Sequence, residues 1–394
     1  MRIAMIGLKA LPARYGGFET AADEMSRRLV QMGHEVIVYN RSGQSTWPTS
    51  DYHGVRLITL PTLKSKNLST IAHAFLSSVD VLFRRADVVH YFTTGTTLFA
   101  PLPRLAGVKI VCSADGTDWQ RAKWGRFARW YLRLSEQIAV LFCHGLVSDS
   151  QEVVRYYREA YGRDSVYIPY GMREKASEGN EWIERLGLKS REFVLFVGRL
   201  VPENNVHNLI KAFEQTRTDK KLVIVGDDPW GKAYVRSLKS TTDPRIVFTG
   251  GVYGDGYEQL QRNAYMFVLP DEVGGTHPAL VEAMGFGNCV LVNDTPSNME
   301  VTGDAGFSYS GADGDRDLCR QMQLLLDSPE IVSRYRPAAR ERALANYSWD
   351  RVVLDHIKLY QELAGGKPAA AAPSKSPAED SVEAEMPEGT PTNP

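Results

Sequence analysis

The chain has 394 residues, enough for two domains that each bury their own core. With 43% hydrophobic and 24% charged residues the composition is that of a globular protein, and no stretch approaches the ~20 apolar residues of a membrane-spanning helix. The formal net charge of −1 gives no global argument for a nucleic-acid-binding protein.

The first 170 residues alternate between short apolar runs and helical periodicity. Strands are predicted at residues 2–7, 35–40, 55–60, 87–92 and 109–114. Helices are predicted at residues 19–31, 67–84, 126–142 and 151–161. This alternation is typical of a parallel sheet wrapped by helices.

A second series of the same kind follows, with strands predicted at residues 192–198, 221–227, 245–250, 264–270 and 289–293. Two doubly wound, Rossmann-like units in tandem explain both series, with a ligand cleft where the carboxyl ends of their strands face each other. The expected division is residues 1–170, residues 171–346, a C-terminal helix at 347–364 that packs back toward the first unit, and a disordered tail at 365–394. Ser348 is the expected N-cap of that helix.

Charge and cysteine distribution add two expectations. Residues 1–172 carry 21 Lys and Arg against 14 Asp and Glu, an excess of seven positive charges by difference, so we expect a basic face there, with chance scatter as the alternative. Cys112, Cys143 and Cys289 lie in apolar runs, which indicates reduced, buried thiols in a cytoplasmic protein. The first apolar run is too short for a signal peptide, and the spacing of the cysteines suggests no metal site.

Glycines stand between the first predicted strand and the helix after it, in IGLKALPARYGGFET (residues 6–20). Gly16 and Gly17 would let the backbone approach a ligand closely, and a helix N-terminus favours an anion. The spacing differs from the GxGxxG dinucleotide fingerprint, since nine residues separate Gly7 from Gly17. A plain loop and helix start is the alternative.

Two further motifs lie in the second unit. In FVGRLVPENN (residues 196–205) a buried strand ends at Arg199, which could bind a diphosphate through two parallel hydrogen bonds or could pair with Glu203 at the surface. In VGGTHPALVEAM (residues 273–284) a glycine-rich corner precedes a helix that carries Glu282. Backbone N–H groups of the corner would face a phosphate or a sugar, and Glu282 could accept hydrogen bonds from ribose hydroxyls, unless it is simply a core residue.

The segment CSADGTDWQRAKWGRFARWYLRLSEQ (residues 112–137) places Asp115 after a predicted strand, where active sites form in such sheets. Beyond it, cationic and aromatic residues interleave at helical spacing: Lys123, Trp124, Arg126, Arg129, Trp130 and Arg133. A cationic face flanked by aromatic rings suits a helix at an anionic lipid surface. The alternative is a solvated basic helix whose aromatic rings pack inward.

Together, LPARYGGFET, DGTDWQRAKW, GRLVPENN and VGGTHPALVEAM resemble the retaining family 4 glycosyltransferases of GT-B fold, in particular a bacterial rhamnosyltransferase-like branch of capsule and exopolysaccharide synthesis. The resemblance implies that the second domain binds a nucleotide diphosphate sugar, that the first binds a lipid-linked or saccharide acceptor, and that no metal or other cofactor is needed. It implies catalytic roles for Asp115, Arg199 and Glu282. The donor-binding residues that it implies are Gly16, Gly17, Arg199, Asn204, Val252, Tyr253, Gly275, Thr276, His277 and Glu282.

Three positions depart from the wider family and resemble that branch: Asn204 replaces a lysine, Gly274 a carboxylate and Asp115 a histidine. A missing carboxylate at Gly274 is compatible with a less hydroxylated 6-deoxy sugar, such as L-rhamnose from dTDP-L-rhamnose. The family resemblance also implies retention at the anomeric carbon, with the departing diphosphate helping to deprotonate the incoming hydroxyl. Arg199 and helix N-terminal amides would stabilise that leaving group.

Other functions stay open. The chain could use a UDP- or GDP-hexose donor, could be a sugar-nucleotide epimerase of the same fold, which would need no acceptor surface, or could bind a sugar nucleotide without catalysis. An NAD-dependent oxidoreductase is disfavoured because no GxGxxG follows a leading strand. The favoured prediction is a cytoplasmic transferase at the inner face of the plasma membrane, in contact with anionic lipid and with no nucleic-acid partner.

Overall fold

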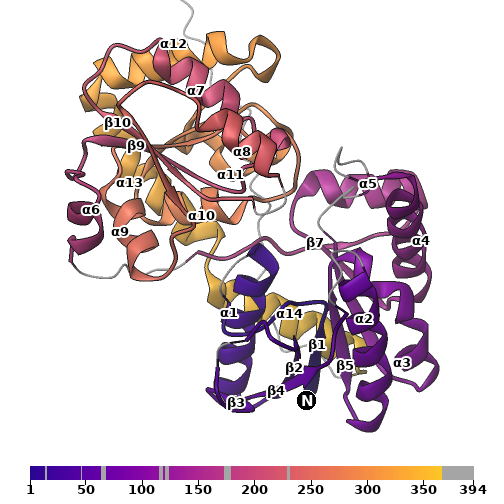
Figure 1. The fold of residues 1–394 in the computed structure, drawn as a ribbon. Helices are drawn as coiled ribbons and strands as arrows, with labels where there is room; N and C mark the ends of the chain where they lie inside the picture. Colours follow the sequence, from indigo (N-terminus) through magenta and orange to yellow (C-terminus); the bar gives the residue numbers. More distant parts are fainter. Residues whose placement is uncertain are drawn as a thin grey trace, which may run out of the picture.

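The computed structural model describes residues 1–13, 16–45, 47–63, 68–114, 119, 124–172, 179–228 and 231–365. It contains two α/β domains, each built on its own sheet, and the last helix returns from the second domain to the first (Figure 1). Asp115, Lys123 and all but the first residue of the predicted tail lie outside the described residues. The predicted pair of doubly wound domains is confirmed.

The sheet of the first domain has eight strands: β1 (Arg2–Ile6), β2 (Glu35–Arg41), β3 (Asp51–Tyr52), β4 (Val55–Leu60), β5 (Val88–Phe92), β6 (Lys109–Ala114), β7 (Gly145–Ser148) and β8 (Val166–Tyr167). Their order is β3-β4-β2-β1-β5-β6-β7-β8, and only the β3–β4 pair is antiparallel. Met5 of the central β1 lies opposite Val38 on one side and His90 on the other. The carboxyl ends of the parallel strands therefore lie at one edge of the sheet.

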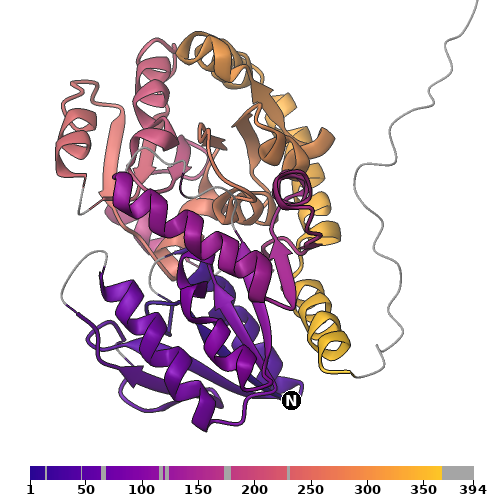
Figure 2. The same ribbon diagram turned by 90° about the vertical axis from the view of Figure 1, so that its right-hand side faces the viewer.

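Helices cover both faces of this sheet. They are α1 (Gly17–Gln31), α2 (Leu68–Asp80), α3 (Pro101–Leu105), α4 (Arg126–Phe142) and α5 (Gln151–Tyr161), with short 3-10 turns η1 (Val81–Phe83) and η2 (Thr94–Phe99). α2, α3 and α4 lie on the right-hand side of the domain in Figure 1, which is the side that faces the viewer in Figure 2.

The second domain repeats the pattern with six parallel strands in the order β11-β10-β9-β12-β13-β14. The strands are β9 (Phe193–Val197), β10 (Lys221–Val225), β11 (Ile246–Gly250), β12 (Met266–Leu269), β13 (Cys289–Asn293) and β14 (Phe307–Tyr309). The helices are α6 (Glu181–Arg185), α7 (Val206–Glu214), α8 (Lys232–Leu238), α9 (Asp255–Asn263), α10 (Pro278–Gly285), α11 (Pro296–Thr302), α12 (Asp315–Asp327) and α13 (Pro329–Asn346), with 3-10 turns η4 (Pro202–Asn204), η5 (Gly303–Ala305) and η6 (Gly311–Asp313).

The last helix, α14 (Trp349–Leu363), follows the second domain in sequence but packs against α1 of the first (Figure 1). The side chain of Ser348 accepts a hydrogen bond from the backbone N–H of Asp350 at 3.3 Å, so the predicted N-cap is confirmed. Trp349 is 2% exposed, and its ring lies so close to Gly171 that a side chain there would collide with it. The crossing point between the domains is therefore closely packed.

Each strand predicted from the sequence is present within a few residues of its expected bounds. The strands that were not predicted, β3, β7, β8 and β14, have two to four residues each, too few to show a hydrophobic period. Cys112, Cys143 and Cys289 are buried free thiols, as predicted.

Candidate active site

The starts of two helices meet where the domains face each other. Gly17 opens α1 in the first domain, and Pro278 opens α10 in the second. A β-carbon on Gly17 would lie only 3.1 Å from Cγ of Pro278, so glycine permits this close approach. Gly16, the N-cap, has a φ of 111°, which favours glycine for a conformational reason as well. Two helix N-termini thus converge on one place, an arrangement that favours an anion between them.

A hydrogen-bonded chain holds Glu282. This residue of α10 is 8% exposed, and its Oε2 accepts a hydrogen bond from the hydroxyl of Tyr257 at 2.5 Å. Nε2 of Gln261 donates to the same hydroxyl at 3.0 Å, and Nδ2 of Asn288 donates to Oε1 of Gln261 at 3.1 Å. The carboxylate is therefore fixed before any ligand arrives. Tyr257 and Gln261 were not predicted, because single polar residues of a surface helix give no signal in sequence.

Arg199 follows β9 and is half-buried. Its guanidinium forms no hydrogen bond or ion pair with any residue that the structure describes, so the predicted alternative of a pair with Glu203 is wrong. Nδ2 of Asn204 would lie 3.3 Å from a β-carbon on Gly198, which places this amide directly beside the end of the strand. A charged group without a protein partner at a strand end is available to a ligand anion.

The loop after β9 is bound to the loop after β12. The backbone N–H of Glu272 donates to the carbonyl of Glu203 at 3.2 Å, and Nδ2 of Asn205 donates to the carbonyl of Pro270 at 3.2 Å. Asn205 has a φ of 48°, a conformation that asparagine tolerates better than most residues. These bonds hold the Arg199 segment next to the corner that leads into α10.

His277 occupies the side of the corner where Gly274 has no side chain. Gly274 has a φ of 146°, and a β-carbon there would lie 3.1 Å from Cε1 of His277. Nδ1 of His277 lies 3.5 Å from Oδ2 of Asp271, a carboxylate that is 4% exposed. The histidine ring is therefore held in place, and it fills the space that a side chain at Gly274 would need.

The corner also touches the first domain through Asp149, which follows β7 and is 9% exposed. The hydroxyl of Thr276 donates to the backbone carbonyl of Asp149, so its side chain serves the contact between domains. A β-carbon on Gly275 would overlap with the carboxylate of Asp149. Asp149 was not among the predicted residues, because its position depends on a contact between the two domains.

Val252 and Tyr253 lie further along the second domain, after β11. Val252 is buried in the core of that domain, so its side chain is not free to meet a ligand. Tyr253 is 54% exposed, and its hydroxyl would lie 2.7 Å from a β-carbon on Gly251. The structure brings Gly17, Thr276 and His277 together at the corner.

Comparisons with known proteins agree with this arrangement. The family described as Glycosyltransferase Family 4 matches residues 15–173, and the family described as Glycosyl transferases group 1 matches residues 179–342. Both matching family models describe glycosyltransferases, and together they cover most of this chain. Its fold is GT-B: the structure of HepE from Anabaena in complex with UDP-glucose superposes with a TM-score of 0.76 over 92% of this chain and 100% of that chain, at 17% identity.

Two curated relatives each match about half of this chain. The O-antigen chain mannosyltransferase B of Escherichia coli is 26% identical over 190 residues, which are 46% of this chain and 49% of that protein. The N-acetylgalactosamine-N,N'-diacetylbacillosaminyl-diphospho-undecaprenol 4-alpha-N-acetylgalactosaminyltransferase of Campylobacter jejuni is 25% identical over 180 residues, 45% of this chain and 49% of that protein. The chain thus spans about half the length of these relatives.

The GT-B first domain carries the predicted cationic and aromatic helix as α4. Phe127 is 70% exposed and Trp130 58% exposed, with their ring centroids 5.8 Å apart, so the alternative that these rings pack inward is wrong. Arg126, Arg129 and Arg133 are exposed beside them, while Trp124 is half-buried. The guanidinium of Arg133 lies 4.0 Å from the ring centroid of Trp119, a cation–π contact. The surface formed by Arg126, Phe127, Arg129, Trp130 and Arg133 is called the α4 face below.

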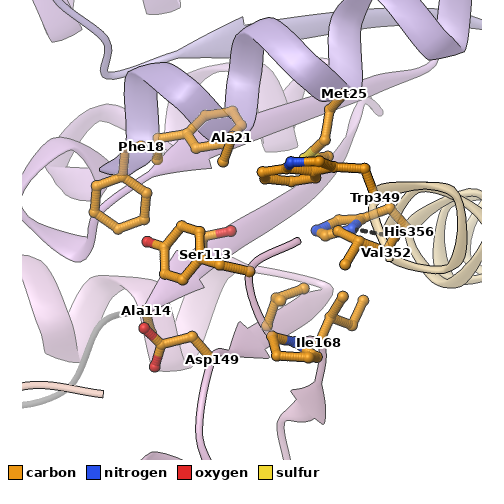
Figure 3. Close-up of a pocket in the computed structure, with 14 residues that line it drawn as sticks. Phe18, Ala21, Met25, Ser113, Ala114, Asp149, Ile168, Trp349, Val352 and His356 are labelled. Atoms are coloured by element: carbon orange, nitrogen blue, oxygen red, sulfur yellow. Dashed lines mark hydrogen bonds between the residues drawn. The ribbon is translucent and has the colours of Figure 1, made fainter. Parts of the chain in front are cut away.

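A cavity of about 30 Å³ lies between α1 and α14 (Figure 3). Phe18, Trp349 and Val352 line its walls, and Asp149 and His356 lie at opposite ends in this view. Nδ1 of His356 lies 2.8 Å from the carbonyl of Val352, and burial lowers the pKa of this histidine to about 4. The imidazole is therefore neutral at pH 7.

The described residues hold neither a metal-binding cluster nor a membrane-spanning helix. No group of three or more His, Cys, Asp or Glu among them is arranged to hold a metal ion. No described helix is both long and apolar enough to cross a membrane.

Proposed function

We propose that this chain transfers a sugar from a nucleotide diphosphate donor to a saccharide acceptor in polysaccharide or glycan synthesis. The observation that carries the proposal is the convergence of two helix N-termini. Arg199, which has no ion-pair partner among the described residues, lies in a loop bound to the loop that leads into α10, and Glu282 is fixed in that helix. An anion at this place would meet positive helix ends, and a ribose would meet a carboxylate already held by Tyr257. The UDP-glucose bound to HepE, a protein of the same fold, supports this choice of donor class.

The reaction proposed is substitution at the anomeric carbon with retention. The bond from that carbon to the diphosphate oxygen breaks, the acceptor hydroxyl forms the new bond on the same face, and its proton passes to the departing diphosphate. Arg199 and the amides at the starts of α1 and α10 would stabilise the negative charge that develops on this leaving group. No protein nucleophile and no metal enters the proposal.

The donor sugar proposed is L-rhamnose, from dTDP-L-rhamnose. The support is that Gly274 offers no carboxylate and that the ring of His277 covers this position, so the second domain offers less hydrogen-bonding capacity to a fully hydroxylated hexose. Turnover should be compared for dTDP-L-rhamnose, UDP-glucose and GDP-mannose under the same conditions. A clear preference for UDP-glucose would overturn the rhamnose assignment while leaving transfer itself intact.

The acceptor proposed is a lipid-linked saccharide at the cytoplasmic face of the membrane. Support comes from the α4 face, whose exposed aromatic rings and arginines suit anionic headgroups. The name of the Campylobacter jejuni relative includes diphospho-undecaprenol, a lipid carrier, which favours the same class of acceptor. Sedimentation with vesicles that contain anionic lipid, compared with neutral vesicles, tests the contact.

The decisive experiment replaces Arg199. Arg199→Ala should lower turnover by about 100-fold or more, because one charged donor to the leaving group is lost, and should leave the melting temperature nearly unchanged. Arg217→Ala, an exposed arginine of the same domain, is the matched control and should retain full turnover. Unchanged turnover in Arg199→Ala would reject the proposed function.

A further inference from the structure

Asp149 stands at a boundary between the two domains. It is the first residue after β7, at the edge of the first sheet where the carboxyl ends of the parallel strands lie. Figure 3 shows its carboxylate beside Ala114, the last residue of β6, at the end of the cavity away from His356. The residue is 9% exposed, and a carboxylate buried to this extent usually has a partner.

The carboxylate of Asp149 reaches into the corner of the second domain. It lies against the bare α-carbon of Gly275, where any β-carbon would overlap with it, and its backbone carbonyl accepts the hydroxyl of Thr276. Gly275 has no positive φ, so the reason for glycine at this position is the space that the carboxylate takes. One negative group of the first domain is thus built into the corner that precedes α10.

The backbone on the C-terminal side of Asp149 is held by contacts within the first domain and by contacts with the second. Ser150 caps α5 by accepting a hydrogen bond from Val153 at 3.3 Å. The N–H of Gln151 donates to Oε2 of Glu300 at 2.8 Å, and the hydroxyl of Ser297 donates to Oε2 of Glu152 at 2.8 Å. These contacts fix where the Asp149 carboxylate stands when the domains are together, which is the condition for precise recognition.

Neither glycine of the corner provides a side chain that could bind a sugar. Gly274 has a φ that disfavours any other residue and is covered by His277, and Gly275 is occupied by the contact with Asp149. A carboxylate accepts hydrogen bonds and cannot donate them, so it suits sugar hydroxyls, whereas it repels a diphosphate. Asp149 should therefore face the sugar, and Arg199 the diphosphate.

We propose that Asp149 is a specificity-determining residue that the first domain contributes to the donor site, where its carboxylate accepts hydrogen bonds from hydroxyls of the transferred sugar. This inference rests on the proposed function, because it assumes that the donor sugar lies at the Gly274–His277 corner. One consequence is that the sugar is recognised only when the two domains are in contact. The nucleotide also meets Arg199 and Glu282 of the second domain, so its binding depends less on that contact between the domains.

The test separates the sugar from the nucleotide. Asp149→Asn keeps the shape and removes the charge, so affinity for UDP, GDP and dTDP should stay unchanged. Affinity for the sugar nucleotide that the wild type uses, found from UDP-glucose, GDP-mannose and dTDP-L-rhamnose, should fall about 10- to 100-fold, as expected for loss of charged hydrogen bonds. Asp164→Asn, the same change at an exposed site of the first domain, is the control. Equal effects on nucleotide and sugar nucleotide, or no effect on either, would overturn the inference.

A second pair of variants guards against a purely structural effect. Gly275→Ala should displace the carboxylate and weaken sugar-nucleotide binding, and adding Asp149→Ala should relieve the overlap without restoring that binding. Restored binding in the double variant would show that the carboxylate only fills space. If Arg199→Ala is inactive while Asp149→Asn is normal, this inference fails alone; if Arg199→Ala is fully active, the proposed function fails first.

Discussion

Two amphipathic helices that pack on the first domain, α4 and α14, differ in whether their large apolar side chains are buried. The α14 helix buries its large side chains: Trp349, Val353 and Tyr360 are at most 2% exposed. The α4 helix buries Leu132, Ser135, Glu136 and Ala139, and leaves Phe127 and Trp130 at the surface. Both helices have 15 residues or more and begin with aromatic residues near their first turns.

This difference shows what an amphipathic pattern does and does not determine. Periodicity predicts where a helix runs and which of its faces differ. It does not determine which face is covered, because that depends on the element packed against the helix. The α14 helix meets the core of the first domain, whereas no described element covers the outer side of α4 (Figures 1 and 2).

The largest expected effect comes from exchanging tryptophan for alanine on each helix. Trp349→Ala removes a buried ring that packs against Gly171 and should lower the free energy of unfolding by about 3–5 kcal/mol. Trp130→Ala removes a ring that is 58% exposed and should change it by less than about 0.5 kcal/mol, while weakening binding to anionic vesicles. Urea unfolding measures both. Similar losses of stability in the two variants would contradict the comparison.

The second effect concerns pH and applies to the contact between α14 and β5, and not to α4. His356 and His90 are buried together, with ring centroids 5.5 Å apart, and burial lowers the pKa of His356 to about 4. The unfolded histidine takes up a proton below about pH 6.5 and the folded one does not, so stability is complete above pH 6.5 and falls as the pH drops toward 4. The loss from His356 should be about 2 kcal/mol between pH 7 and pH 5.

A second histidine, His90, contributes to this pH effect, and a variant of His356 separates the two contributions. Burial lowers the pKa of His356, and the Val352 carbonyl and Asp355 only partly oppose this. The pKa of His90 is also lowered, by burial and by His356, so both histidines act in the same direction. His356→Gln should reduce the slope of stability against pH over this range, measured by urea unfolding at pH 7 and pH 5. An unchanged slope would mean that His356 is accessible to protons in the folded protein.

Much of the fold followed from the sequence because parallel strands buried on both faces show as continuous apolar runs. FVLFV of β9 and CVLVN of β13 are examples, each bounded by polar residues. The strands that were missed have no such run: β8 has two residues and β14 three. A strand of this length exists only because a neighbour supplies its hydrogen bonds, and that information is not local.

Part of the candidate site was predictable because the apolar runs also show where the strands end. Gly17 starts a helix, Arg199 follows a strand end and Glu282 lies in the short helix after the corner, positions that indicate a ligand in a doubly wound sheet. Asp149 and Tyr257 were missed because each acquires its place from a partner distant in the sequence, Gly275 in one case and Glu282 in the other. Only the folded contact distinguishes them from ordinary surface residues.

The third effect concerns the charge of the α4 face. Arg126→Gln and Arg129→Gln should each weaken binding to vesicles containing anionic lipid by about 1 kcal/mol, roughly fivefold in partitioning, and added salt should reduce the difference. Arginine does not titrate between pH 7 and pH 5, so binding should stay constant over the range where α14 loses stability. Arg334→Gln, an exposed arginine on α13 of the second domain, is the control. Loss of binding in the control would point to net charge and not to this face.

The smallest effect tests whether an ion pair contributes to the docking of α14. Nε of Arg28 on α1 lies 2.9 Å from Oδ1 of Asp350, but the side chain of Asp350 is 71% exposed and Arg28 also contacts Glu24. Asp350→Ala should therefore lower the free energy of unfolding by less than about 1 kcal/mol, because water competes for both partners. Ser348→Ala removes the N-cap of the same helix and should cost about 1 kcal/mol. If Asp350→Ala cost as much as Trp349→Ala, charge and not apolar burial would hold α14 on the first domain, and the contrast with α4 would need a different cause.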